Sequence, residues 1–157
     1  MSLHSAWVHI PIAMILFAPI ATFLSLYFAR KPGSPLKFLL PAWHFLLIAA
    51  LYTALAFGDQ DKDARKWEND VQIENHRDSA QILFIAAIVT FFPAVLTVKK
   101  DSKKGFYTFV LILELVSIGL CWKTVLAGHT IVFNQADAFA RPSPSESSRL
   151  FENQKKP

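Results

Sequence analysis

The chain has 157 residues, of which 53% are hydrophobic, and a formal net charge of +4. This apolar content, with a mean hydropathy of +0.33, excludes an ordinary soluble domain of this length. The sequence has no Gly-rich phosphate loop and no basic-aromatic pattern, so no nucleic-acid partner is expected.

Four apolar runs follow one another along the chain, at residues 6–29, 38–57, 79–98 and 106–133. Runs of about 20 apolar residues are typical of transmembrane helices. Residues 1–136 are therefore predicted to form an all-α integral membrane four-helix bundle in contact with the lipid bilayer. Residues 137–157, rich in Ser, Pro and charge, are predicted to be a tail that is disordered or ordered only by a partner.

A cleaved signal peptide is the alternative interpretation of the first run. A signal peptide carries positive charge before its apolar stretch. Here the first six residues contain no Lys or Arg, whereas Arg30 and Lys31 follow the run. We therefore expect the first run to be retained as a span.

The charges between the runs predict the orientation, because short cytoplasmic loops are enriched in Lys and Arg. Residues 30–37 hold three basic residues and no acid, and residues 99–104 hold four lysines and one Asp. Residues 58–78 hold seven carboxylates against four bases. The sequence thus predicts an N-out, C-out protein with both termini outside the cytoplasm.

Four of the five histidines are expected in one layer near the outer face. At about 1.5 Å per residue, His9 lies about 5 Å and His129 about 6 Å below the outer boundary. His76 immediately precedes the third span, and His4 precedes the first. Three different helices would therefore bring imidazoles to one level.

Imidazole binds transition metals and is an axial ligand of haem iron. Haem b needs two histidines from different helices at similar depth, which His9 with His76, or His76 with His129, would supply. A copper, zinc or iron ion would use three or four of these histidines, with Glu74 or Asp78 as a further ligand. The alternative is that these histidines are merely interfacial residues.

The inner half holds two other ionisable groups, His44 and Glu114, about 9 Å and about 12 Å from the cytoplasmic boundary. A carboxylate at that depth is costly unless it is neutral or paired. His44 is its candidate partner by depth. A protonated Glu114 packed against Ser or backbone groups is the alternative.

The stretch "HSAWVHIPIAM", residues 4–14, resembles the opening of a bacterial membrane family of unknown function with the pattern HPxxVHFPIAL. The likeness continues through Gly58-Asp59 and His76 to "AGHTIVF", residues 127–133, which resembles the closing pattern GGxLVYxxG. It implies a four-span bundle of the bacterial inner membrane with a site near His4, His9 and His76. Together with the loop charges, it places both termini in the periplasm. Ser5 and Ile10 depart from the pattern, and His129 stands where a small residue is usual.

Together these features predict an electron-transfer membrane protein that binds haem b, or alternatively a bare metal ion, at the periplasmic side. His9 and His76 are the expected axial ligands, and His4 and His129 are second choices or partners of the propionates. The alternative is an accessory subunit of a larger membrane complex without a cofactor. A proton or small-solute conduit using Glu114 and His44 is a third interpretation. No catalytic residues are predicted, so a stand-alone enzyme is the less favoured reading.

Overall fold

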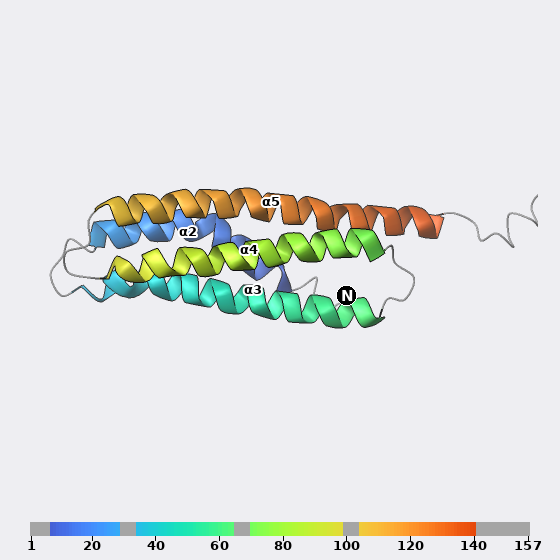
Figure 1. The fold of residues 1–157 in the computed structure, drawn as a ribbon, viewed down its shortest axis with the longest axis horizontal. Coiled ribbons are helices and arrows are strands. Elements are labelled where there is room, and N and C mark those ends of the chain that lie inside the picture. The colour runs from blue at the N-terminus through green and yellow to red at the C-terminus, as the bar shows by residue number, and fades with distance from the viewer. Residues whose placement is uncertain (1–6, 29–33, 65–69, 99–103, 141–157) are drawn as a thin grey trace, which may run out of the picture.

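The computed structural model describes residues 7–28, 34–64, 70–98 and 104–140. Its described residues are all-helical, with no strand. The elements are α2 (His9–Phe28), the short 3-10 helix η1 (Pro35–Phe38), α3 (Leu39–Ala64), α4 (Asp70–Leu96) and α5 (Lys104–Ala140). The four long helices run alternately in opposite directions and pack side by side (Figure 1). The predicted all-α four-helix bundle is therefore confirmed.

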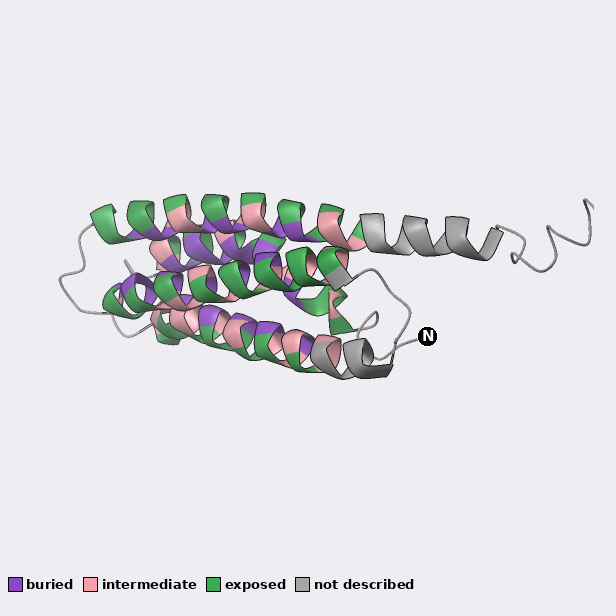
Figure 2. Ribbon diagram, turned by 45° about the vertical axis from the view of Figure 1, so that its right-hand side comes forward, coloured by how far each residue is buried: buried purple, intermediate pink, exposed green. Residues whose placement is uncertain are grey.

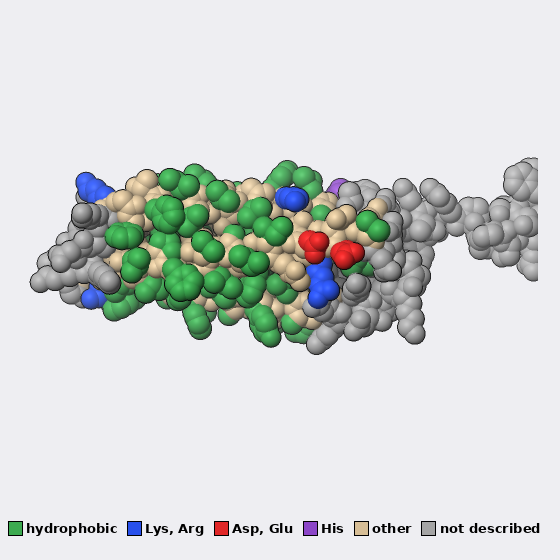
Figure 3. All heavy atoms as spheres, in the orientation of Figure 1, with side chains coloured by type: hydrophobic (Ala, Val, Ile, Leu, Met, Phe, Trp, Pro, Cys, Tyr) green, Lys and Arg blue, Asp and Glu red, His purple; other side chains and the backbone are tan. Residues whose placement is uncertain are grey.

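Four helical stretches are long and apolar enough to cross a membrane, and the second of them includes η1. These stretches are His9–Phe28, Pro35–Gly58, Val71–Leu96 and Lys104–His129. Large apolar side chains such as Phe92 and Trp122 point outward, and apolar groups cover the bundle along most of its length (Figure 3). The described surface therefore fits contact with lipid.

The helices form a square in which each one touches two neighbours. Helix α2 packs against α3 and α5, and α4 packs against the same two helices. Within the described residues, the diagonal pairs α2 with α4 and α3 with α5 make no backbone-level contact. We term the end of the bundle where α2 and α4 finish the inner end, and the opposite end the outer end, after the orientation that the loop charges predict (Figure 1).

The helices extend beyond the predicted runs at the outer end. The second run ends at residue 57 but α3 continues to Ala64, and the third begins at residue 79 but α4 begins at Asp70. Helix α5 continues to Ala140, into the segment expected to be a tail. Hydropathy marks the part of a helix that lies in lipid, whereas helical hydrogen bonding can continue through polar sequence, in α3 even through Gly58.

Two apolar clusters fill the interior, one in the outer half and one near the inner end. Buried faces of all four helices meet along the axis (Figure 2). The outer apolar cluster consists of Ile15, Leu47, Leu51, Leu83, Ala87 and Cys121. The inner apolar cluster consists of Leu40, Ala94, Tyr107 and Val110.

Candidate functional site

A layer of polar side chains separates the two apolar clusters. Each helix contributes one of them, and each is 2% exposed or less. On α5, for example, Glu114 lies between Val110 of the inner cluster and Cys121 of the outer cluster. We term this layer the central polar level, and it consists of Thr22, His44, Thr90 and Glu114.

The spacing of buried residues explains why these side chains face inward. The buried positions of α5 are separated alternately by three and four residues, which keeps one face of a helix toward its partners. They are Tyr107, Val110, Glu114, Ser117, Cys121 and Thr124. Glu114 thus occupies a regular interior position of α5 and does not point to lipid.

One oxygen of Glu114 is contacted from two other helices. Thr22 on α2 donates its hydroxyl proton to Oε1 of Glu114 at 2.6 Å. Nε2 of His44 on α3 lies 3.4 Å from the same oxygen. The structure therefore brings Glu114 and His44 together across the diagonal of the square.

The second ring nitrogen of His44 fixes which protons the pair can hold. Nδ1 lies 3.0 Å from the backbone carbonyl oxygen of Leu40. A carbonyl only accepts hydrogen bonds, so Nδ1 carries a proton. A favourable contact between Nε2 and Oε1 of Glu114 then requires one proton between them. Whichever atom holds it, the pair has no net charge, which suits a site buried from water.

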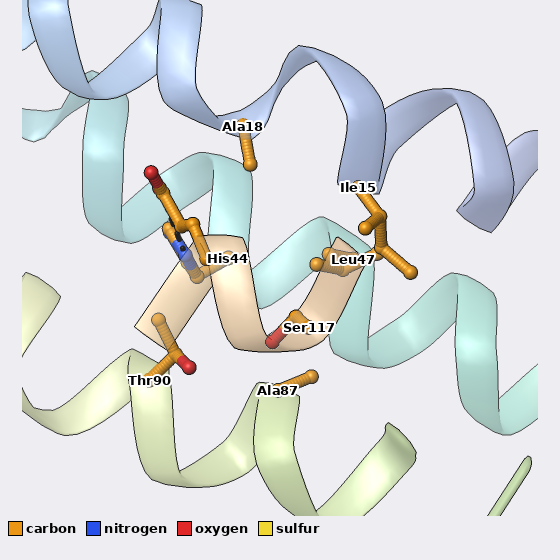
Figure 4. Close-up of a pocket in the computed structure, with 8 residues that line it drawn as sticks. Ile15, Ala18, His44, Leu47, Ala87, Thr90 and Ser117 are labelled. Carbon is orange, nitrogen blue, oxygen red and sulfur yellow. Dashed lines mark ion pairs between the residues drawn. The ribbon is translucent and has the colours of Figure 1, made fainter. Parts of the chain in front are cut away.

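A cavity of about 10 Å³, close to the volume that one water molecule needs, adjoins the pair. Its lining residues come from all four helices, and half of them are apolar (Figure 4). Thr90 and Ser117 also line it, and both donate their hydroxyl protons to carbonyls of their own helices, at 2.7 Å and 2.9 Å. Their oxygens retain only acceptor capacity, so the polar part of the wall favours a ligand that donates hydrogen bonds.

The histidines expected at the outer face are placed differently from one another. His9 is the first residue of α2 and is exposed, and His129 on α5 is also exposed. His76 on α4 is partly buried, with Nδ1 3.0 Å from the Thr124 carbonyl of α5. His4 lies outside the described residues.

His9 and His76 lie on α2 and α4, a diagonal pair of helices whose Cα atoms nowhere come within 8 Å of each other in the described part of the bundle. Within residues 7–28, 34–64, 70–98 and 104–140, no group of three or more His, Cys, Asp or Glu side chains is placed to hold a metal ion. The described residues therefore do not support the predicted site of three or four imidazoles. A two-histidine haem site stays a prediction.

The sequence interpretation missed the hydroxyl groups of the site, Thr22, Thr90 and Ser117. Their signal is weak, because Ser and Thr are common in membrane helices and bond to their own backbone. The positions of Thr22 and Ser25, three residues apart on the face of α2 that also buries Ala18 and Ala21, are the available clue. That face combines small and hydroxyl side chains, which is typical of an interface between membrane helices.

Comparison of the chain with known protein families, curated proteins and solved structures finds no match. The resemblance of residues 4–14 to a bacterial membrane family therefore depends on the residues quoted for it. The geometry of the central polar level is the basis for the functional argument.

Replacement of Glu114 distinguishes a hydrogen-bonded acid from a packing residue. The two amide protons of Glu114→Gln can bond to Thr22 and to Nε2 of His44, whereas Glu114→Leu removes the partner of both groups at this oxygen. We expect Glu114→Leu to lower the free energy of unfolding by about 1–3 kcal/mol more than Glu114→Gln does. Unfolding in mixed micelles measures this difference, with the exposed Thr108→Ala as the control. An equal decrease in the free energy of unfolding for the two variants would contradict the hydrogen bonding of Glu114 with Thr22 and His44.

Two glycines of α5 provide a matched test of the His76 contact. A Cβ atom added at Gly128 would lie 3.0 Å from Cε1 of His76, whereas one added at Gly119 has nothing within 4 Å. Because the ring is held on the Thr124 carbonyl, we expect Gly128→Ala to destabilise the bundle by about 1 kcal/mol or more. Gly119→Ala should be neutral or stabilise by up to about 1 kcal/mol. Thermal unfolding in detergent compares them, and equal midpoints would refute the contact.

Proposed function

We propose that this integral membrane protein takes up and releases a proton at the pair formed by Glu114 and His44. The observation that carries the proposal is the 3.4 Å contact between His44 Nε2 and Glu114 Oε1, buried at the centre of four apolar helices. Ionisable groups within membrane bundles are costly and commonly mark proton or ion pathways. The third interpretation of the sequence, which uses these two residues, is thus the one that the geometry favours.

The number of protons on the pair affects the packing of the bundle. With one proton between Nε2 and Oε1, the contact is a hydrogen bond or an ion pair without net charge. Loss of that proton places two lone pairs, one of them on a carboxylate, 3.4 Å apart. A further proton gives the pair a positive charge in a medium of low dielectric constant. Either change alters the force between α3 and α5, whose Cα atoms nowhere come within 8 Å of each other in the described residues.

Stability alone does not account for this pair. Replacing a buried ion pair with well-packed apolar residues is often neutral or stabilising. The neighbouring layers of this bundle show that apolar side chains fit the same four helices. A proton-binding role supplies a reason for placing a carboxyl group and an imidazole in the layer between them.

Infrared difference spectroscopy during acidification tests the proposal. The wild-type protein in lipid nanodiscs should show a carbonyl band from a protonated carboxyl group in apolar surroundings, because Glu114 is buried. Glu114→Gln should lack this band, His44→Phe should displace its titration, and Thr108→Ala should match the wild type. Identical spectra for the wild type and Glu114→Gln would refute the proposal and favour a structural subunit.

Haem b binding at His76 for electron transfer is a second candidate function. The Nδ1 proton of His76 is donated to the Thr124 carbonyl, which places the lone pair of the neutral ring on Nε2. Histidines that bind metals commonly donate their other nitrogen to a carbonyl in this way. This candidate rests on the orientation of one imidazole, whereas the proton site rests on contacts from two helices to one carboxyl oxygen.

An absorption spectrum of the purified protein tests this second candidate. If haem b is bound, reduction by dithionite should produce the sharp bands of a b-type cytochrome, and His76→Ala should abolish them. His9→Ala should do the same if His9 is the second axial ligand, whereas His129→Ala should leave the bands in place. A protein purified from haem-replete cells without such bands would contradict the candidate.

A further inference from the structure

One carboxyl oxygen of Glu114 has no hydrogen-bond partner in the described part of the chain. Thr22 and His44 both contact Oε1, whereas Oε2 is buried and unpartnered. Buried polar atoms are almost always paired with protein groups or with ordered water. Hydrocarbon around the bundle cannot supply the missing bond. The cavity that Glu114 lines is the space available for a partner of Oε2.

This cavity lies on the outer side of the central polar level. Each helix lines it with a residue three or four positions outward from its own member of that level, namely Ala18, Leu47, Ala87 and Ser117. Ala18 points from α2 toward the lining residues of the other helices (Figure 4). The volume of about 10 Å³ is close to that of one water-sized sphere, so a larger ligand does not fit.

We propose that this cavity binds one water molecule, which is hydrogen-bonded to Oε2 of Glu114. A buried water needs about two to four polar partners. The residues of the wall offer Oε2 and the hydroxyl oxygens of Thr90 and Ser117, whose own protons are donated within their helices. Water can donate one proton to Oε2 and the other to a hydroxyl oxygen. When Oε2 itself carries a proton, it donates to the water instead, so the site suits both forms of the carboxyl group.

Apolar side chains enclose this water from both ends of the bundle. The outer apolar cluster contributes Ile15, Leu47 and Ala87 to the cavity wall. The inner apolar cluster closes the opposite side of the central polar level, where Leu40 and Val110 are 0% exposed. The water therefore exchanges with bulk water only when the helices part. A consequence that rests on the proposed proton function is that proton uptake and release also require this opening.

Nuclear Overhauser contacts between water and alanine methyl groups test the site in the unaltered protein. The protein is deuterated except at its alanine methyls and studied in lipid nanodiscs. Ala18 and Ala87 line the cavity, so both should show cross-peaks at the water frequency. Ala94 is the matched control, because it lies on the same helix as Ala87 and is 0% exposed within the inner apolar cluster. Cross-peaks missing at Ala18 and Ala87, or equally strong at Ala94, would overturn the proposal.

A pair of variants separates bound water from the Thr90 and Ser117 hydroxyls, which can pass on the water signal by proton exchange. Ala18→Val fills the cavity and leaves both hydroxyls in place. Ala21→Val makes the same change at a buried position of α2 that does not line the cavity. The Ala87 cross-peak should fall to background in Ala18→Val and persist in Ala21→Val. An unchanged cross-peak in both variants would assign the signal to the hydroxyls and refute the water site.

A crystal structure at a resolution that shows ordered water decides the question if Ala18→Val does not fold. Density for one isolated water within hydrogen-bonding distance of Oε2 is expected, and a well-ordered site without it would count against the proposal. The water site does not depend on titration of Glu114. The infrared experiment can therefore fail while the water is found, and the reverse is also possible, so the two proposals are tested separately.

Discussion

The carboxyl group of Glu114 imposes the main constraint on the interior of this bundle. Hydrocarbon offers it no hydrogen bonds, and a lone charge there is costly. The protein meets this constraint from two directions, with the Thr22 hydroxyl at 2.6 Å and the His44 imidazole at 3.4 Å. Three of the four helices are thereby tied to one oxygen atom, and their rotation and depth relative to one another are set by it.

The contact also links helices that the square arrangement keeps apart. Neighbouring helices can slide past one another when their contacts are only apolar, since lipid tails are as apolar as the side chains. A hydrogen-bonded pair across the diagonal penalises such sliding, because a shift leaves a buried polar group without its partner. Single buried polar residues fix the register of coiled coils in the same way. A change in the proton content of the pair would relax or strengthen this restraint.

The sequence predicts the helices well and the site only in part. Hydropathy identifies all four spans. It does not identify the extensions of α3 and α4, because these parts of the helices are polar. Counting residues predicts depth, so Glu114 and His44 were expected at similar levels. Depth does not give the direction of a side chain around the helix axis. His9 and His76 show the difference, because they are predicted to share a level but lie on diagonal helices whose Cα atoms nowhere come within 8 Å of each other in the described residues.

The hydroxyl groups of the interior differ in the acceptor to which each donates its proton. Thr90, Ser117 and Thr124 donate to carbonyls four residues earlier in their own helices, at 2.7–2.9 Å. The proton of each of these hydroxyls is thus hydrogen-bonded within its own helix and makes no bond to a neighbouring helix. Thr22 instead donates to Glu114, and Ser25 has no partner among the described residues. Among these four partnered hydroxyls, that of Thr22 alone is donated to a neighbouring helix, so α2 supplies the hydroxyl that stabilises the carboxyl group.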